Sequence, residues 1–222
     1  MQSILSLGIP GYRDTPVPNT FIRQDHASPH LAILLPGYGY RATMPAVYHP
    51  ERLLIRQGAD ILRLEYAYDQ QADFRGLPED ERDLWFFADV EAARDIGRAQ
   101  GSYEQVTLVG KSMGTLAMGH LLSTGTWLEQ VRCVWVTPLL RDDRLRAQIK
   151  QAKPRSLFVV GTADGHYDPA HLAEVEQATQ GHSVVIKGAN HSLEIGDSTA
   201  PSPSTLERVM RAMESFLGGA VS

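Results

Sequence analysis

The chain has 222 residues, of which 43% are hydrophobic, enough apolar side chain to build one sizeable core. Because no linker or shift in composition divides it, we expect a single domain over residues 1–222. The formal net charge of −5, with the basic residues scattered along the chain, argues against nucleic acid or an anionic membrane as a partner. The sequence shows neither the pattern of a signal peptide nor an apolar run of about 18 residues, so we expect a cytoplasmic protein.

The first half of the chain predicts strands alternating with helices. Ser3 to Gly8 and Asn19 to Arg23 predict an antiparallel edge hairpin, and Leu31 to Leu35 is an apolar run typical of a buried parallel strand. A helix is predicted from Met44 to Gln57, a strand from Asp60 to Tyr66, and a long helix from Glu79 to Gln100. In the long helix we expect one buried face, made of Leu84, Phe87, Val90 and Ala93.

The second half continues this alternation. Strands are predicted at 106–109, 131–137, 156–160 and 182–187, and helices at 113–124, 141–151, 169–179 and 204–217. The order implies an α/β fold with a mainly parallel central sheet and helices on both faces. In such sheets ligands bind at the carboxyl ends of the strands, so the loops after residues 35, 109, 160 and 187 are expected to share one functional edge.

The segment around Ser112 predicts a tight turn from strand to helix. Gly110 and Gly114 stand two residues on either side of the serine and allow neighbouring backbones to approach closely. Such a turn strains the serine backbone, exposes its hydroxyl and directs the first N–H groups of the helix toward the same point. Two other interpretations of Ser112 are that it only caps the helix or that it ends a phosphate-binding loop. The phosphate-binding motif requires a glycine at position 105, but that residue is Gln105, which argues against it.

Serine becomes a nucleophile when a base accepts its proton and a carboxylate orients that base. Asp164 and His191 follow Ser112 at the predicted edge, so we assign nucleophile, acid and base to Ser112, Asp164 and His191. Asp168 is an alternative acid, although its place directly before Pro169 is typical of a helix cap.

Other histidines offer alternatives for the base. His166 lies in the acid loop and His182 opens a strand, whereas His191 follows the last strand. The histidines also lack metal-ligand spacing, so no metal is expected. Catalysis by Ser112, His191 and Asp164 needs no cofactor, and none is expected.

In these motifs the sequence resembles the α/β-hydrolase family, from about Leu31 to the C-terminus. The resemblance is carried by three turns in order, Gly110-Lys-Ser-Met-Gly114, Gly161-Thr-Ala-Asp164 and Gly188-Ala-Asn-His191. It implies an α/β-hydrolase fold and a serine hydrolase that forms an acyl-enzyme on Ser112.

The resemblance also implies an oxyanion hole made of two backbone N–H groups. One belongs to Met113, after the nucleophile, and the other is assigned to Tyr38 in the loop Pro36-Gly37-Tyr38, where the family usually carries His-Gly. Lys111 departs from the histidine or aromatic residue that is common inside the elbow. It is either a structural neighbour beneath the turn or the partner of a nearby carboxylate.

The substrate is expected to be a small, soluble ester or thioester. Tyr40, Tyr66 and Tyr68 fall in or near the carboxyl-end loops and are candidates to line its pocket. The family most often inserts a lid in the region that corresponds to residues 138–155. This segment is long enough for only one charged helix and its loops, so no cap domain is expected. The alternative function is a catalytically inactive protein that keeps the fold for binding or as a scaffold.

Overall fold

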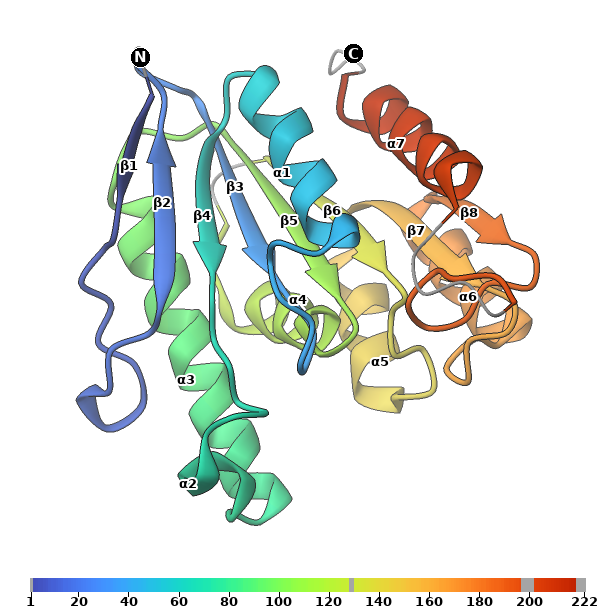
Figure 1. The fold of residues 1–222 in the computed structure, drawn as a ribbon, viewed down its shortest axis with the longest axis horizontal. Coiled ribbons are helices and arrows are strands. Elements are labelled where there is room, and N and C mark those ends of the chain that lie inside the picture. Colours follow the sequence, from blue (N-terminus) through green and yellow to red (C-terminus); the bar gives the residue numbers. More distant parts are fainter. Residues whose placement is uncertain (1, 128–129, 197–201, 219–222) are drawn as a thin grey trace.

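The fold is built around one central β-sheet. The computed structural model describes residues 2–127, 130–196 and 202–218, and within these ranges eight strands form one sheet in the order β1-β2-β4-β3-β5-β6-β7-β8 (Figure 1). The strands are β1 Ser3–Leu5, β2 Asn19–Arg23, β3 His30–Leu35, β4 Asp60–Leu64, β5 Gln105–Lys111, β6 Gln130–Val136, β7 Arg155–Gly161 and β8 His182–Ile186.

The pairing confirms the predicted α/β class. β1 and β2 form the antiparallel edge hairpin, β2 pairs antiparallel with β4, and every pair from β4 to β8 is parallel. Register places Leu35 beside Gly110 and Lys111 beside Val136, so the carboxyl ends of β3, β5 and β6 finish together. The loops predicted to share an edge therefore do so, at the lower edge in Figure 1.

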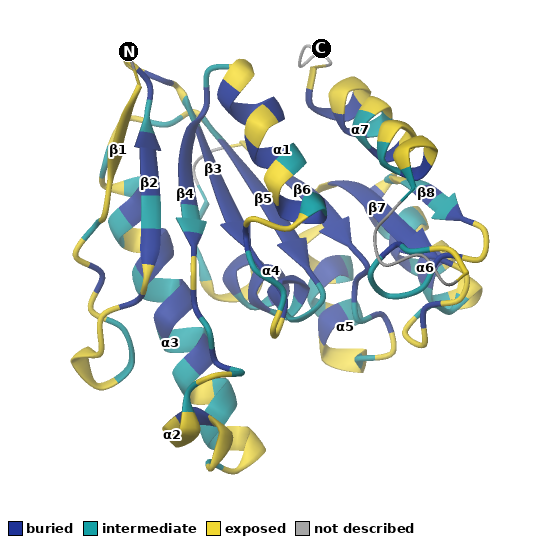
Figure 2. Ribbon diagram, viewed as in Figure 1, coloured by how far each residue is buried: buried dark blue, intermediate teal, exposed yellow. Residues whose placement is uncertain are grey.

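Helices cover both faces of the sheet. They are α1 Pro45–Arg56, α2 Ala72–Arg75, α3 Glu79–Arg98, α4 Met113–Thr124, α5 Asp143–Ala152, α6 Pro169–Thr179 and α7 Pro203–Gly218. Side chains of α3, α4, α5 and α6 share one apolar cluster with the sheet, and side chains of α1 and α7 share another. Because both faces are packed, the central strands are buried along most of their length, as their continuous apolar runs require (Figure 2).

The buried face of α3 is predicted correctly at three of its four positions. Val90 and Ala93 are buried and Phe87 is half-buried against the same apolar cluster, whereas Leu84 is 62% exposed. The first turns of α3 extend beyond the sheet, together with the short helix α2 that was not predicted (Figure 1). A residue there has no sheet to pack against, whatever its place in the helical period.

The connection from β6 to β7 contains the single helix α5, and the absence of a cap domain is confirmed for the described chain. Asp142 caps this helix by accepting a hydrogen bond from the Leu145 N–H at 2.7 Å. α5 packs between α4 and α6, where Arg146 and Lys150 both pair with Glu174 of α6. The helix therefore belongs to one face of the sheet and does not cover the carboxyl edge.

None of the described helices combines the length and the apolar character needed to cross a bilayer.

Candidate active site

The turn at Ser112 has the strained geometry that its sequence predicts. Ser112 has φ 52° and ψ −118°, outside the regions that L-residues prefer, and α4 begins at the next residue. A Cβ atom at Gly114 would lie 1.9 Å from the Leu35 carbonyl oxygen, and one at Gly110 would lie 2.6 Å from the Gly114 carbonyl oxygen. Both positions therefore require glycine, since neither contact leaves room for a side chain.

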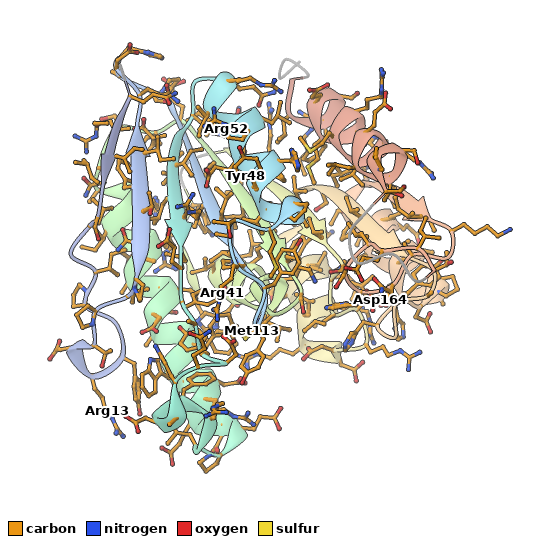
Figure 3. The ribbon with its side chains drawn as sticks, in the orientation of Figure 1. Arg13, Arg41, Tyr48, Arg52, Met113 and Asp164 are labelled. Carbon is orange, nitrogen blue, oxygen red and sulfur yellow. The ribbon has the colours of Figure 1, made fainter. Side chains whose placement is uncertain are left out.

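Ser112, His191 and Asp164 form one continuous hydrogen-bonded chain. The Ser112 Oγ lies 2.8 Å from His191 Nε2, and His191 Nδ1 lies 2.8 Å from Asp164 Oδ2. The three residues come from the ends of β5, β8 and β7, and Figure 3 labels Asp164 at this edge of the sheet. The sequence-predicted nucleophile, base and acid are thus brought together, each within hydrogen-bond distance of the next.

Asp164 is held as a carboxylate. Its side chain is 2% exposed, and this burial alone raises its pKa, but hydrogen bonds from His191 and from the His166 N–H outweigh burial and leave the pKa below its usual value. An ionised carboxylate only accepts hydrogen bonds, so His191 Nδ1 carries the proton and donates it. The other ring nitrogen, Nε2, is then free to accept the proton of Ser112.

The competing acid and bases lie elsewhere. Asp168 is the cap of α6, where its carboxylate accepts hydrogen bonds from the N–H groups of Ala170 and His171. His182 opens β8 at the amino end, far along the strand from the functional edge. His166 is exposed and its ring centroid is 5.3 Å from that of His191, so it lies beside the base but not in its place.

The two predicted oxyanion-hole residues, Met113 and Tyr38, lie in segments next to Ser112. Met113, labelled in Figure 3, is the first residue of α4, so its N–H has no acceptor within the helix. The loop after β3 closes through a hydrogen bond from the Tyr40 N–H to the Gly37 carbonyl at 3.1 Å, which does not use the N–H of Tyr38. A Cβ atom on Gly37 would lie 3.2 Å from the Ser112 Cβ, so this loop lies directly against the elbow.

A cavity of about 430 Å³ opens in front of the serine. Tyr38 and Met44 at its rim are 49% and 38% exposed, which leaves the mouth open to solvent. The predicted pocket residue Tyr40 is in the wall. The full lining is Tyr38, Gly39, Tyr40, Met44, Pro45, Lys111, Ser112, His191, Ser192 and Glu194.

Tyr66 and Tyr68 do not line this cavity, and their prediction as substrate-binding residues is corrected. Both are buried, stacked on each other with ring centroids 4.8 Å apart and packed against Phe86. Their position just after a strand places them near the edge, but their rings turn inward against α3. Tyr66 instead supports the loop after β3, because its hydroxyl donates a hydrogen bond to the Pro36 carbonyl at 2.7 Å.

Lys111 is buried beneath the elbow, 2% exposed. Its ammonium donates hydrogen bonds to the Thr137 hydroxyl and to the His191 carbonyl, both at 3.1 Å. No carboxylate of the described chain lies within ion-pair distance of it. The structure therefore favours the interpretation of Lys111 as a neighbour beneath the turn over that of a carboxylate partner. Its contact with His191 had no signal in the sequence, because the two residues meet only when β5 and the last loop fold together.

Comparisons with known proteins agree with this geometry. Residues 30–218 match the model of a family described as an alpha/beta hydrolase domain, and no curated protein is significantly similar to the chain.

Several solved structures share the fold at low sequence identity. An esterase from Pyrococcus furiosus is 14% identical, with a TM-score of 0.70 over 97% of this chain and 92% of the other. A serine hydrolase without a lid from Xanthomonas campestris is 17% identical, with a TM-score of 0.68 over 98% and 94%. The esterase domain of a Rhodothermus marinus protein is 14% identical, with a TM-score of 0.66 over 97% of each chain. At these identities the likeness shows the fold alone, but the family model spans more than half of the chain, and the protein therefore belongs to the α/β-hydrolase family.

Proposed function

We propose that this protein is a serine hydrolase of the ester and thioester class, which acts through an acyl-enzyme on Ser112. The observation that carries the proposal is the unbroken chain from the Ser112 hydroxyl through His191 to the Asp164 carboxylate, with 2.8 Å at both links. This order of hydroxyl, imidazole and carboxylate is the one that nucleophilic catalysis by serine requires. No cofactor enters this chemistry.

In the first half-reaction, Ser112 Oγ attacks the carbonyl carbon of the substrate while its proton moves to His191 Nε2. The negative charge that develops on the carbonyl oxygen is stabilised by the N–H groups of Met113 and Tyr38 and by the N-terminus of α4. When the tetrahedral intermediate collapses, the bond to the leaving alcohol or thiol breaks and His191 returns the proton to it. The Asp164 carboxylate stabilises the imidazolium throughout.

In the second half-reaction, water takes the place of the leaving group. His191 accepts a proton from the water, the oxygen attacks the acyl carbon, and a second intermediate forms at the same N–H groups. Its collapse breaks the bond to Ser112 Oγ, which recovers its proton from His191. The products are a carboxylic acid and the free enzyme.

The cavity supports small substrates. Its volume of about 430 Å³ lies at the low end for small-molecule sites, and its mouth is open on the solvent side. The wall combines the Tyr40 ring with polar groups, which suits an acyl group of limited length better than a long lipid chain.

Hydrolysis of matched acetyl substrates tests the proposal. We expect p-nitrophenyl acetate and acetylthiocholine to be cleaved, acetyl p-nitroanilide to be cleaved far more slowly, and Ser112→Ala to lower turnover by at least about 10³-fold. Ester cleavage near the wild-type rate in Ser112→Ala contradicts the proposal. If a folded wild-type protein cleaves no member of a broad ester, thioester and amide panel, the scaffold alternative is supported instead.

A further inference from the structure

The side chain of Lys111 contacts three of the loops that form the candidate active site. Lys111 ends β5 just before the nucleophile, and its two hydrogen bonds reach Thr137, after β6, and the His191 carbonyl, after β8. Its Nζ also lies 4.7 Å from the centroid of the Tyr40 ring, in the loop after β3. One ammonium group thus connects the nucleophile strand to the loop that carries the base.

This position is costly for a charged group. Lys111 is among the most buried polar residues of the described chain, and its three donors meet two neutral oxygens and the face of an aromatic ring instead of a carboxylate. A methionine of similar volume would fill the same space without that cost. The charge is therefore difficult to explain by packing alone.

The hydrogen bond to the His191 carbonyl suggests a function for the charge of Lys111. The Lys111 ammonium holds the backbone carbonyl of the residue whose imidazole must stay at 2.8 Å from the serine hydroxyl. Asp164 fixes the far side of that imidazole through Nδ1, but nothing in its hydrogen bond restrains the main chain of the loop. A charge-assisted hydrogen bond to the carbonyl supplies this restraint.

We propose that Lys111 is a positioning residue whose charged ammonium group holds the His191 main chain, and through it the imidazole, in line with Ser112. The inference rests on the proposed hydrolase function. Lys111 is part of the cavity lining, but its ammonium contacts Thr137, the His191 carbonyl and the Tyr40 ring, so the role proposed for it acts through His191 and Tyr40.

The positioning depends on the charge of Lys111, which changes with pH. Burial lowers the pKa of Lys111 to about 8, against the opposing attraction of Asp164 and Glu194. The other titratable group that faces it is Tyr40, whose pKa is raised by burial, so Tyr40 remains neutral as Lys111 loses its proton. Above pH 8 the neutral amine is a weaker donor and no longer a cation, and we expect the rate to decline.

The test compares Lys111→Met and Lys111→Gln with the wild type and with Lys187→Met, which removes an exposed lysine from the turn that follows β8. The measured quantities are kcat and KM for p-nitrophenyl acetate and the second-order rate of Ser112 phosphonylation by a fluorophosphonate, from about pH 6.5 to 10. We expect Lys111→Met to lower kcat and the phosphonylation rate by about 10- to 100-fold with little change in KM. Lys111→Gln, which keeps a donor but no charge, is expected to lie between it and the wild type.

The pH profile separates positioning from a merely structural role. Wild type and Lys187→Met should lose rate as the pH rises through about 8, whereas both Lys111 variants should show no such decline. Equal rates in wild type and a folded Lys111→Met, or the same alkaline decline in Lys111→Gln, overturns the inference. If neither variant folds, a wild-type profile that stays flat to pH 10 overturns it as well. A wild type that does not react with the fluorophosphonate at all contradicts the proposed function, a separate outcome.

Discussion

Asp164 and Asp168 are two aspartates in one loop with separate tasks. Asp164 accepts a hydrogen bond from His191, and Asp168 accepts hydrogen bonds from the first turn of α6. Asp164→Asn should lower kcat by about 10³- to 10⁴-fold, because the amide no longer holds the imidazole in the required tautomer. Asp168→Asn should leave kcat/KM within about twofold of wild type, since asparagine caps helices equally well. Steady-state kinetics of both variants decide which aspartate orients His191. The assignment of Asp164 is wrong if Asp168→Asn lowers kcat/KM more than Asp164→Asn does.

The other two members of the chain act as one unit with Asp164. Ser112→Ala and His191→Ala should each lower kcat by at least about 10³-fold, and the double variant should fall little further than either single one. Their thermal midpoints should change little, because both side chains lie at the open edge of the sheet. If the fold-reductions in kcat of the two single variants multiply in the double variant, the two residues do not act in one shared mechanism.

At the scale of single residues, position along the sequence predicted that Ser112, Asp164 and His191 lie close together. It did not predict the orientation of nearby side chains. The three lie at strand ends, and parallel strands finish at one edge, so order along the chain was sufficient. Tyr66 and Tyr68 follow β4 at the same edge, yet their rings turn toward Phe86 because a large apolar cluster lies there. Which way a side chain faces depends on packing partners distant in the sequence.

The elbow is the element on which the geometry depends most. A methyl group at Gly114 would lie 1.9 Å from the Leu35 carbonyl oxygen and 2.9 Å from that of Pro36, where the loop after β3 begins. Gly114→Ala should therefore destabilise the protein by about 1–3 kcal/mol or more and displace the loop, with kcat lowered by about 10²-fold. Denaturant unfolding and steady-state kinetics measure the two effects.

Gly165→Ala is the matched control for Gly114→Ala. Gly165 lies next to Asp164, and a methyl group there would meet nothing within 4 Å. We expect it to leave stability and kcat close to wild type. If Gly114→Ala behaves like this control, the close approach of the loop to the elbow is not required for activity.

The order of strands and helices was predictable, but the extent of one buried helix face was not. Apolar runs and glycine stops indicate where elements begin and end, and these signals are local. Val90 and Ala93 are buried as predicted, but Leu84, in the second turn of α3, is exposed. The first turns of α3 extend past the sheet, with α2 beside them (Figure 2). How far a helix overhangs its sheet is a property of the tertiary structure.

At the scale of the whole molecule, no cap domain covers the candidate site within the described residues, and we expect this to favour substrates with short acyl chains. α5 is fixed to α6 through Arg146 and Lys150 and does not cover the cavity. Among p-nitrophenyl esters from acetate to palmitate, we expect kcat/KM to be highest for short acyl chains, with no jump in rate where the ester forms micelles. Highest activity on dodecanoate or longer esters contradicts this account of the site.

The buried charge of Lys111 also links the stability of the fold to pH. The pKa of Lys111 is about 8 in the folded protein against an ordinary value of 10.5, so the unfolded chain binds the extra proton between these values. Stability therefore rises with pH across this interval, by an amount on the order of 3 kcal/mol. Denaturant unfolding of wild type and Lys111→Met at about pH 7.5 and pH 10 isolates this contribution. If the free energies of unfolding of the two proteins differ by the same amount at both pH values, the proposed contribution of Lys111 is contradicted.

Covalent labelling is the decisive test of Ser112 as the nucleophile of a working active site. The native protein is incubated with a fluorophosphonate, digested and examined by mass spectrometry, with Ser112→Ala treated in parallel. We expect one phosphonyl group per chain, carried by the peptide that contains Ser112, and none on the Ser112→Ala protein. A folded wild-type protein that remains unlabelled, or one labelled at a residue other than Ser112, would contradict this assignment.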